Sequence, residues 1–586
     1  MIHSETSMPL SADSGIGAQA PSVAEALVEA LSELGICAAF GVSGGAVAPL
    51  WDALTRSRKI EVLHFRHEAG AAFAAAETYF AGGHAAAVCV TSGPGITNAL
   101  TGMLAARGDG AKTILISGST PQPQRDRGAF QETSPQALGA DVFCVGPLFH
   151  YAAEVHTAED LGEARNQLAE GLGRPGGFVA HLSLSPATQK SRFLCSLSGA
   201  PAWPGTSTSV SVPRAPDHTV RACADILATE RVALWVGFGA RHAAPEVAVL
   251  AKRLGAPVFC TPRGKGIFPE NHPRFVGVTG LGSDHSVTDF LADAGVERIL
   301  VLGSRLGEMT SFWHPGLVPD KGFIHVDIDP DVPGKAYPDA HTVAVHADIR
   351  AFLSDVLELI PAGRVPLGPS FPAARHAATA SDRDRGDLHG VRPQVLMTAV
   401  QRLVVEESDA VVLTEAGNAF AWGTLGLRFP TPGRYRVSTG FGSMGHAATG
   451  VLGAAYATRS KAVALVGDGS MLMNCEISTA VQYGIPAVWI VLNDAGYGMI
   501  RQGMSGLGLT VSPDFDVPPT DFAQLARAMG ADGLRVTSED DLPTALATAM
   551  RAASPFVLDV LVDPTCKAPI GNRVANLATH EAEEKL

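Results

Sequence analysis

Short apolar runs alternate with segments of helical periodicity along most of the chain. In the N-terminal third, uncharged runs at residues 37–40, 86–90 and 113–116 are each followed by a glycine- or serine-rich turn. Runs of this length and composition are typical of parallel strands buried on both faces, with helices as the crossovers between them. The pattern therefore predicts an α/β protein built from doubly wound parallel sheets.

Two stretches of different composition interrupt this alternation. Residues 196–216 are rich in Ser, Pro, Gly and Thr, and residues 361–390 include the charged run SDRDRGD. Both compositions are typical of linkers. We therefore expect three domains, at residues 21–188, 215–360 and 390–570, with the first and third sharing a layout.

One segment of the third domain carries a recognisable chemical pattern. A predicted strand at 462–466 ends in Gly467-Asp468-Gly469-Ser470, and a second strand at 487–492 ends in Asn493-Asp494. The carboxyl ends of parallel strands meet at one edge of a sheet, where ligands bind. Two carboxylates at that edge suit Mg²⁺, and the glycines allow the backbone to approach a diphosphate. The alternative is that both motifs are ordinary turns after strands.

Composition narrows the functional classes. The chain has 586 residues, 46% hydrophobic and 17% charged, which favours large buried cores over disorder. A net charge of −14 argues against a nucleic-acid-binding protein. The eight cysteines form no C-x-x-C pair and the N-terminus lacks a signal-peptide pattern, so we expect a cytoplasmic protein. Residues 437–458 carry no charge but contain five glycines, which favours a buried loop and helix over a membrane span.

The motifs, taken in order, resemble a known family. GVSGGAVAPLWDAL, RHEAGAAFAAAETYFAGG, VTSGPGITN, AFQET, GSMG, GDGS and LNDAGYGMIRQ follow one another as in the thiamine-diphosphate (ThDP)-dependent enzymes, and most closely as in the acetolactate synthases. The resemblance covers residues 21–570 and implies pyrimidine-binding, central and diphosphate-binding domains in that order. It also implies ThDP and Mg²⁺ as cofactors.

The resemblance assigns catalytic roles to two residues of the first domain. Glu68 matches the family glutamate that hydrogen-bonds N1′ of the aminopyrimidine and thereby activates the cofactor. Gln131 matches a residue that lines the reaction site. The alternatives are a glutamate placed to favour a helix dipole and a plain loop residue, respectively.

Further residues match the family's cofactor and metal contacts. The metal ligands implied are Asp468, Asp494 and the backbone carbonyl of Gly496. Met444 would lie beneath the cofactor and hold its two rings in a V, although a methionine is by default core. Asn418 would contact the diphosphate, although an Asx turn is the alternative. The complete set of implied cofactor contacts is Gly44, Asn98, Asn418, Ala419, Gly442, Met444, Gly467, Gly469, Ser470 and Tyr497.

The resemblance implies a decarboxylating carboligase. Such an enzyme takes a 2-oxo acid, here pyruvate, releases CO₂ and joins the remaining fragment to a second carbonyl compound. It also implies a homodimer or homotetramer whose sites lie between subunits, small-molecule 2-oxo acid substrates, and no nucleic-acid or membrane partner.

Departures from the family pattern keep alternatives open. Gly503 stands where anabolic acetolactate synthases carry Trp, and Ser43 replaces a Pro. These favour a specialised lyase, decarboxylase or carboligase with a non-pyruvate substrate as the second hypothesis; a non-catalytic homologue is the third. FAD is a further candidate, because Arg305 and HVDIDP resemble the flavin-binding version, but WVGFGAR is not a dinucleotide motif.

Overall fold

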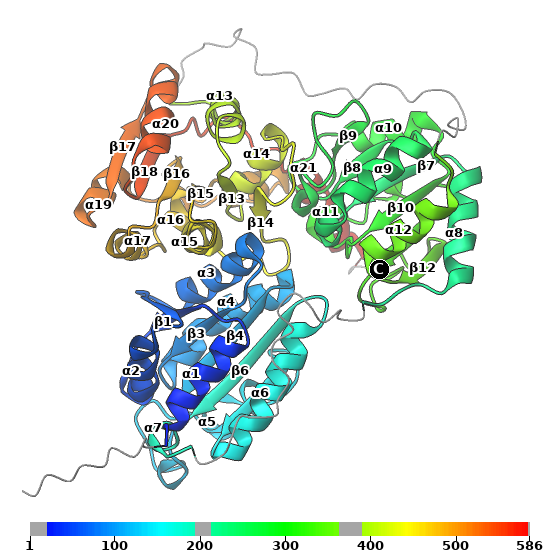
Figure 1. The fold of residues 1–586 in the computed structure, drawn as a ribbon. Helices are drawn as coiled ribbons and strands as arrows, with labels where there is room; N and C mark the ends of the chain where they lie inside the picture. Colours follow the sequence, from blue (N-terminus) through cyan, green and yellow to red (C-terminus); the bar gives the residue numbers. More distant parts are fainter. Residues whose placement is uncertain (1–19, 194–211, 363–389, 584–586) are drawn as a thin grey trace, which may run out of the picture.

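Three six-stranded parallel sheets, each covered by helices on both faces, make up the part of the protein that the structure describes (Figure 1). The computed structural model describes residues 20–193, 212–362 and 390–583, with one sheet in each range. The two stretches of linker composition lie mostly outside the described residues. The α/β fold with three parallel-sheet domains is confirmed.

The first domain has the strand order β2-β1-β3-β4-β6-β5. Its strands are β1 (Ala38–Val42), β2 (Glu61–His64), β3 (Ala86–Val90), β4 (Lys112–Gly118), β5 (Tyr151–Val155) and β6 (Phe178–Leu184). Its helices are α1 (Val23–Glu33), α2 (Ala48–Ser57), α3 (Glu68–Gly82), α4 (Pro94–Asp109), α5 (Pro135–Leu138), α6 (Ala158–Gly173) and α7 (Pro186–Lys190). β3 and β6 are buried along their whole length, and β4 is buried at every position after Lys112, as their apolar sequences predict.

The third domain repeats this topology, with the order β14-β13-β15-β16-β18-β17. Its strands are β13 (Val411–Thr414), β14 (Tyr435–Val437), β15 (Ala462–Gly467), β16 (Ala487–Asn493), β17 (Asp532–Val536) and β18 (Phe556–Leu561). Its helices are α13 (Pro393–Val400), α14 (Asn418–Gly426), α15 (His446–Thr458), α16 (Asp468–Met471), α17 (Ile477–Tyr483), α18 (Gly498–Gly506), α19 (Phe522–Ala528), α20 (Leu542–Arg551) and α21 (Gly571–Glu583).

The central domain is wound differently, in the order β12-β11-β10-β7-β8-β9. Its strands are β7 (Val232–Val236), β8 (Val258–Cys260), β9 (Phe275–Val278), β10 (Arg298–Leu302), β11 (Phe323–Asp327) and β12 (Thr342–His346). Its helices are α8 (Asp217–Thr229), α9 (Ala244–Leu254), α10 (Ser286–Ala294), α11 (Glu308–Ser311) and α12 (Ile349–Leu359). The shared layout of the first and third domains thus does not extend to the domain between them.

The first and third domains pack against each other through α3 and α15, which lie side by side (Figure 1). The helices can approach closely because Gly453 faces Ala74, where a Cβ on the glycine would lie 1.9 Å from the alanine carbonyl oxygen. A buried cluster of charge crosses the same contact. The Glu77 carboxylate accepts hydrogen bonds from Arg436 Nε at 2.9 Å and from His446 Nε2 at 2.9 Å.

Within the described ranges, no helix combines the length and the apolar character needed to cross a bilayer. The uncharged stretch at 437–458 forms a strand end, a glycine-rich loop and the buried helix α15, as its glycine content predicts.

Candidate functional site

The third sheet carries a large cavity at the carboxyl ends of three of its strands. The cavity has a volume of about 1200 Å³ and is lined by the turns that follow β13, β15 and β16. After β13 the chain continues to β14 on one side of the sheet, and after β15 it continues to β16 on the other side. The adjacent carboxyl ends of β13 and β15 therefore form a topological switch point. Ligands of open α/β sheets bind at such points.

Asp468 lies at the centre of this edge and is 3% exposed. Its Oδ1 accepts a hydrogen bond from the Gly469 amide at 2.8 Å, and its Oδ2 accepts one from the Gly496 amide at 2.9 Å. Burial, with a smaller contribution from the Asp494 carboxylate, raises the pKa of Asp468 to about 6. The three residues predicted to hold a metal therefore converge at one end of the cavity.

Asp494 follows β16 and faces the same cavity. Burial raises its pKa, although the ion pair that it forms with Arg501 acts in the opposite direction. Two carboxylates at one buried site disfavour each other's charge, so a cation stabilises the pair. Carboxylate and carbonyl oxygens are the ligands that Mg²⁺ prefers.

The first turn of α14 lines the opposite wall. Asn418 and Ala419 are the first two residues of this helix, and Gly417 precedes them with a φ of +112° that only glycine adopts readily. The Asn418 side-chain oxygen is buried and, among the described residues, has no hydrogen-bond partner. The backbone amides at the start of α14, a nine-residue helix, can bind an anionic ligand. The unpaired Asn418 oxygen can accept a hydrogen bond from a donor group of the same ligand.

Met444 and Tyr497 flank the GDG turn. A Cβ on Gly469 would lie 2.9 Å from Tyr497 Cε1 and 3.4 Å from Met444 Cε, so only glycine fits between them. Gly442, Gly467 and Ser470 line the same cavity. All the third-domain residues predicted to contact the cofactor or metal thus come together.

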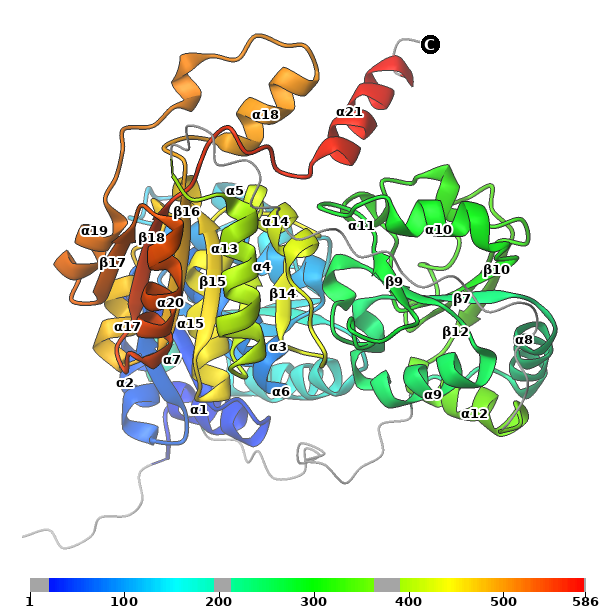
Figure 2. The ribbon, with the colours of Figure 1, turned by 90° about the horizontal axis from the view of Figure 1, so that it is seen from above.

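Elements after the last strand close the cavity. Residues 562–578, including the start of α21, line it together with α18. Figure 2 shows α18 and α21 outside the third sheet, with α21 extending toward the central domain. There Asn572 Nδ2 donates to Ser283 Oγ at 3.3 Å, and Asn576 Nδ2 donates to Glu308 Oε1 at 3.2 Å. The sequence analysis missed this wall, because nothing local marks the C-terminal segment as lining a site.

The first-domain candidates form a second group at the carboxyl edge of their own sheet. Glu68 begins α3 and is 7% exposed, and Asn98 Nδ2 donates to its Oε2 at 3.0 Å. A Cβ on Gly95 would lie 3.6 Å from Glu68 Oε1, and one on Gly44 would lie 2.5 Å from Thr91 Oγ1. Glu68, Asn98 and the two glycine turns therefore form one polar group.

Gln131 adjoins this group through the Gly93 turn, where a Cβ on the glycine would lie 2.9 Å from Gln131 Cα. Its φ of +55° is rare for a residue with a side chain and indicates local strain. The neighbouring Phe130 is 89% exposed. Neither Gln131 nor the Glu68 group lines the third-domain cavity of the same chain.

Glu476, which the sequence analysis did not single out, links the two groups within the chain. Its fully buried carboxylate accepts hydrogen bonds from the amides of Arg66 and His67, at 3.1 and 2.9 Å, just before Glu68 begins α3. Glu476 itself lies on the segment between the GDG turn and α17. The third domain therefore fixes the backbone that presents Glu68.

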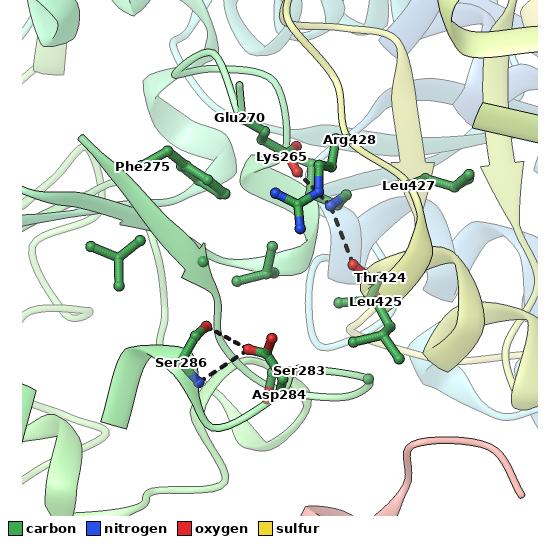
Figure 3. A pocket seen from close by; sticks show the side chains of 14 residues that line it. Lys265, Glu270, Phe275, Ser283, Asp284, Ser286, Thr424, Leu425, Leu427 and Arg428 are labelled. Atoms are coloured by element: carbon green, nitrogen blue, oxygen red, sulfur yellow. Dashed lines mark hydrogen bonds and ion pairs between the residues drawn. The ribbon is translucent and has the colours of Figure 1, made fainter. Parts of the chain in front are cut away.

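A much smaller cavity, of about 30 Å³, lies between the central and third domains (Figure 3). Lys265 Nζ donates to Glu270 Oε2 at 2.7 Å and to the carbonyl of Thr424 at 3.4 Å. Both side chains of the ion pair are 1% exposed. Since Thr424 lies in the last turn of α14, this lysine ties the central domain to the helix whose first turn lines the large cavity.

The glycines of the central-domain turn WVGFGAR are explained by packing. A Cβ on Gly237 would lie 2.4 Å from the Gly303 carbonyl oxygen, and one on Gly239 would lie 2.8 Å from Gly303 Cα. These glycines allow the turns after β7 and β10 to touch, so they give no support to a flavin site.

Comparisons with known proteins agree with this geometry. Residues 21–138 match the N-terminal TPP binding domain of thiamine pyrophosphate enzymes, residues 220–356 the central domain, and residues 415–560 the C-terminal TPP binding domain. Thiamine pyrophosphate is another name for ThDP.

Full-length relatives match over nearly the whole chain. The acetolactate synthase large subunit of Parasynechococcus marenigrum is 30% identical, with 94% of this chain and 89% of that protein aligned. The acetolactate synthase isozyme 3 large subunit of Escherichia coli is 28% identical, over 92% of this chain and 95% of that protein. A probable acetolactate synthase large subunit of Methanocaldococcus jannaschii is also 28% identical, over 94% of each chain. The chain therefore belongs to the ThDP-dependent enzyme family and is acetolactate synthase-like.

Proposed function

We propose that this enzyme is a Mg²⁺- and ThDP-dependent carboligase that decarboxylates pyruvate and joins the remaining two-carbon fragment to a second carbonyl compound. The observation that carries the proposal is the convergence of Asp468, Asp494 and the start of α14 in one cavity of about 1200 Å³. The family supplies the ThDP requirement and the carboligase class. The metal, the donor and the residue roles are the proposal.

The cavity residues fit the cofactor in both charge and shape. Asp468, Asp494 and the Gly496 carbonyl would hold Mg²⁺, while Asn418 and the Ala419 amide would hold the diphosphate. Met444 would support the rings from beneath. Bound ThDP supplies a carbanion at C2 and an electron sink for decarboxylation. The chain's own contribution is to bind, to orient and, through Glu68, to hold a proton at the pyrimidine.

We further propose that Glu68 serves the cofactor of a partner subunit. Glu68 does not line the cavity that contains Asp468 in its own chain. Large apolar side chains are exposed beside both the Glu68 group and the Asp468 cavity. They are Phe130, next to Gln131, and Phe441, Leu472 and Met473, around the GSMG and GDGS turns. Exposed apolar residues of this size support an interface, here one that brings the Glu68 group of one subunit to the Asp468 cavity of another in a homodimer or a homotetramer.

Subunit complementation tests this arrangement. A chain with Glu68→Gln and a chain with Asp468→Asn are each expected to be inactive alone. If sites lie between subunits, one of the two sites in a hybrid dimer is intact, so equal co-expression restores about a quarter of wild-type activity. Sites confined to single chains would give no recovery. Because the readout is acetolactate formed from pyruvate, it tests the reaction as well.

A specialised carboligase, lyase or decarboxylase with another substrate is the second candidate. It rests on Gly503 of α18, where a Cβ would meet no atom within 4 Å, so the side of the helix at this position is open. Mass spectrometry of products from pyruvate alone, and from pyruvate with a panel of aldehydes and 2-oxo acids, separates this candidate from the pyruvate carboligase.

We also propose a cytoplasmic location. The cysteines in the described ranges are free thiols, which supports this location.

A further inference from the structure

Arg501, in the first turn of α18, lies against the loop that carries the candidate metal ligands Asp494 and Gly496. Its Nη2 forms an ion pair with Asp494 Oδ2 at 2.9 Å, and its Nη1 forms one with Asp516 Oδ1 at 2.6 Å. The guanidinium also packs on the loop backbone, because a Cβ on Gly496 would lie 2.9 Å from Arg501 Cζ. One arginine therefore contacts both the Asp494 side chain and the residue whose carbonyl is the third candidate ligand.

The ion pair occupies one side of the Asp494 carboxylate. A Cβ on Gly498 would lie 2.3 Å from Asp494 Oδ2, so this glycine makes room for the paired oxygen. Arg501 is the one cation that pairs with this carboxylate within the described ranges, and it does so through Oδ2. With Oδ2 paired, Oδ1 is the oxygen that stays free of a cationic partner, as the single side-chain oxygen of an asparagine would be.

The concentration of negative charge at the site favours the ion pair between Asp494 and Arg501. Asp468 and Asp494 are both largely buried, with side-chain exposure of 16% for Asp494. A divalent cation balances two carboxylates, and a diphosphate then adds further negative charge to the same crevice. Without a compensating group, the second carboxylate would oppose the anion.

We propose that Arg501 is a positioning residue that neutralises Asp494, so that an aspartate at this position can share a crevice with Mg²⁺ and a diphosphate. The inference deepens the proposed function and rests on it. It requires that Asp494 and Arg501 act as one neutral unit, because the charge of the second partner, Asp516, is screened by solvent at a side-chain exposure of 63%. This requirement distinguishes the inference from an arginine that only stabilises the loop.

The unit predicts opposite effects for its two halves. Arg501→Gln leaves an uncompensated carboxylate, so affinity for the diphosphate falls while affinity for the metal is kept or increased. Asp494→Asn leaves Arg501 paired only with the exposed Asp516, so affinity for the metal falls while affinity for the diphosphate is kept. Each loss is expected to be about tenfold or more, as for a unit charge a few ångströms away in a partly buried site. A purely structural role would weaken both affinities together.

The test is a double-mutant cycle with binding readouts. Mn²⁺ affinity at saturating ThDP is measured by electron paramagnetic resonance on wild type, Arg501→Gln, Asp494→Asn and the double variant. ThDP affinity at saturating Mn²⁺ is measured by quenching of tryptophan fluorescence, since Trp422 lines the cavity. Arg535→Gln is the matched control, because Arg535 likewise pairs with two carboxylates of the same domain, Asp521 at 3.3 Å and Asp559 at 3.5 Å, but does not line the cavity.

The expected result is an opposite pattern in the single variants and recovery of both affinities to within about threefold of wild type in the double variant. Losses that simply add in the double variant, or single variants that weaken both ligands alike, overturn the inference while leaving the proposed function standing. Wild-type protein that binds neither Mn²⁺ nor ThDP overturns the proposed function and the inference together.

Discussion

The buried charge cluster between α3 and α15 gives the sharpest prediction about what holds the two cofactor-binding domains of one chain together. Glu77 and Arg436 are each 2% exposed on their side chains, and His446 is 5% exposed. Glu77→Gln keeps the shape of the side chain but removes the charge that both partners face. Arg436 then remains buried beside a neutral amide.

The size of the effect follows from the pKa of Glu77. Burial alone would raise it, but Arg436 and His446 outweigh burial and lower the pKa from 4.5 to about 2. A shift of that size corresponds to about 3 kcal/mol of stabilisation of the folded state. Since the folded value lies below the unfolded one, this contribution is complete above pH 4.5 and is lost as the pH falls toward 2.

Native-state hydrogen exchange, followed by mass spectrometry of peptides from α3 and α15, measures the loss locally. At pH 7 we expect protection in Glu77→Gln to fall by about a hundredfold. Glu61→Gln is the matched control. It breaks another ion pair between the first and third domains, to Arg459 at 2.8 Å, but its side chains are 50% and 68% exposed, so an effect below about 1 kcal/mol is expected.

The reasoning is refuted if Glu77→Gln and Glu61→Gln reduce protection equally. It is also refuted if the difference between wild type and Glu77→Gln stays constant when unfolding is measured at pH values between 4.5 and 2, because the stabilisation would then not come from the ionised carboxylate.

Three further predictions concern the cavity and its supports. Glu68→Gln should reduce turnover by at least about a hundredfold with unchanged thermal unfolding, measured by product formation from pyruvate; wild-type turnover would remove its catalytic role. Asp468→Ala should release ThDP during gel filtration in Mg²⁺-containing buffer, where wild type retains it; equal cofactor content in both would contradict the metal site. Lys265→Met should destabilise the protein by about 3–5 kcal/mol, because it leaves Glu270 buried and unpaired. In denaturant unfolding, Lys265→Met/Glu270→Leu should recover most of this loss. A double variant as unstable as the single one would argue against the ion pair as the cause.

Some residues of the candidate site could be predicted from local sequence patterns, and others could not. Asp468 and Asp494 could be found because each follows an apolar strand at a glycine turn, and parallel strands bring such turns to one edge. Arg501 and Glu476 could not be found in this way. Their roles depend on which backbone amides and carboxylates lie beside them, and those groups come from distant parts of the chain.

The sequence by itself determined the α/β class, the three sheets and the order of the motifs, because hydrophobic periodicity and turn chemistry are local properties. The tertiary structure alone decided that the Glu68 group and the Asp468 cavity are separate within one chain, and that α21, which the central domain contacts, helps to close that cavity. Burial, ion pairing and the meeting of distant segments are properties of packing, which no short stretch of sequence specifies.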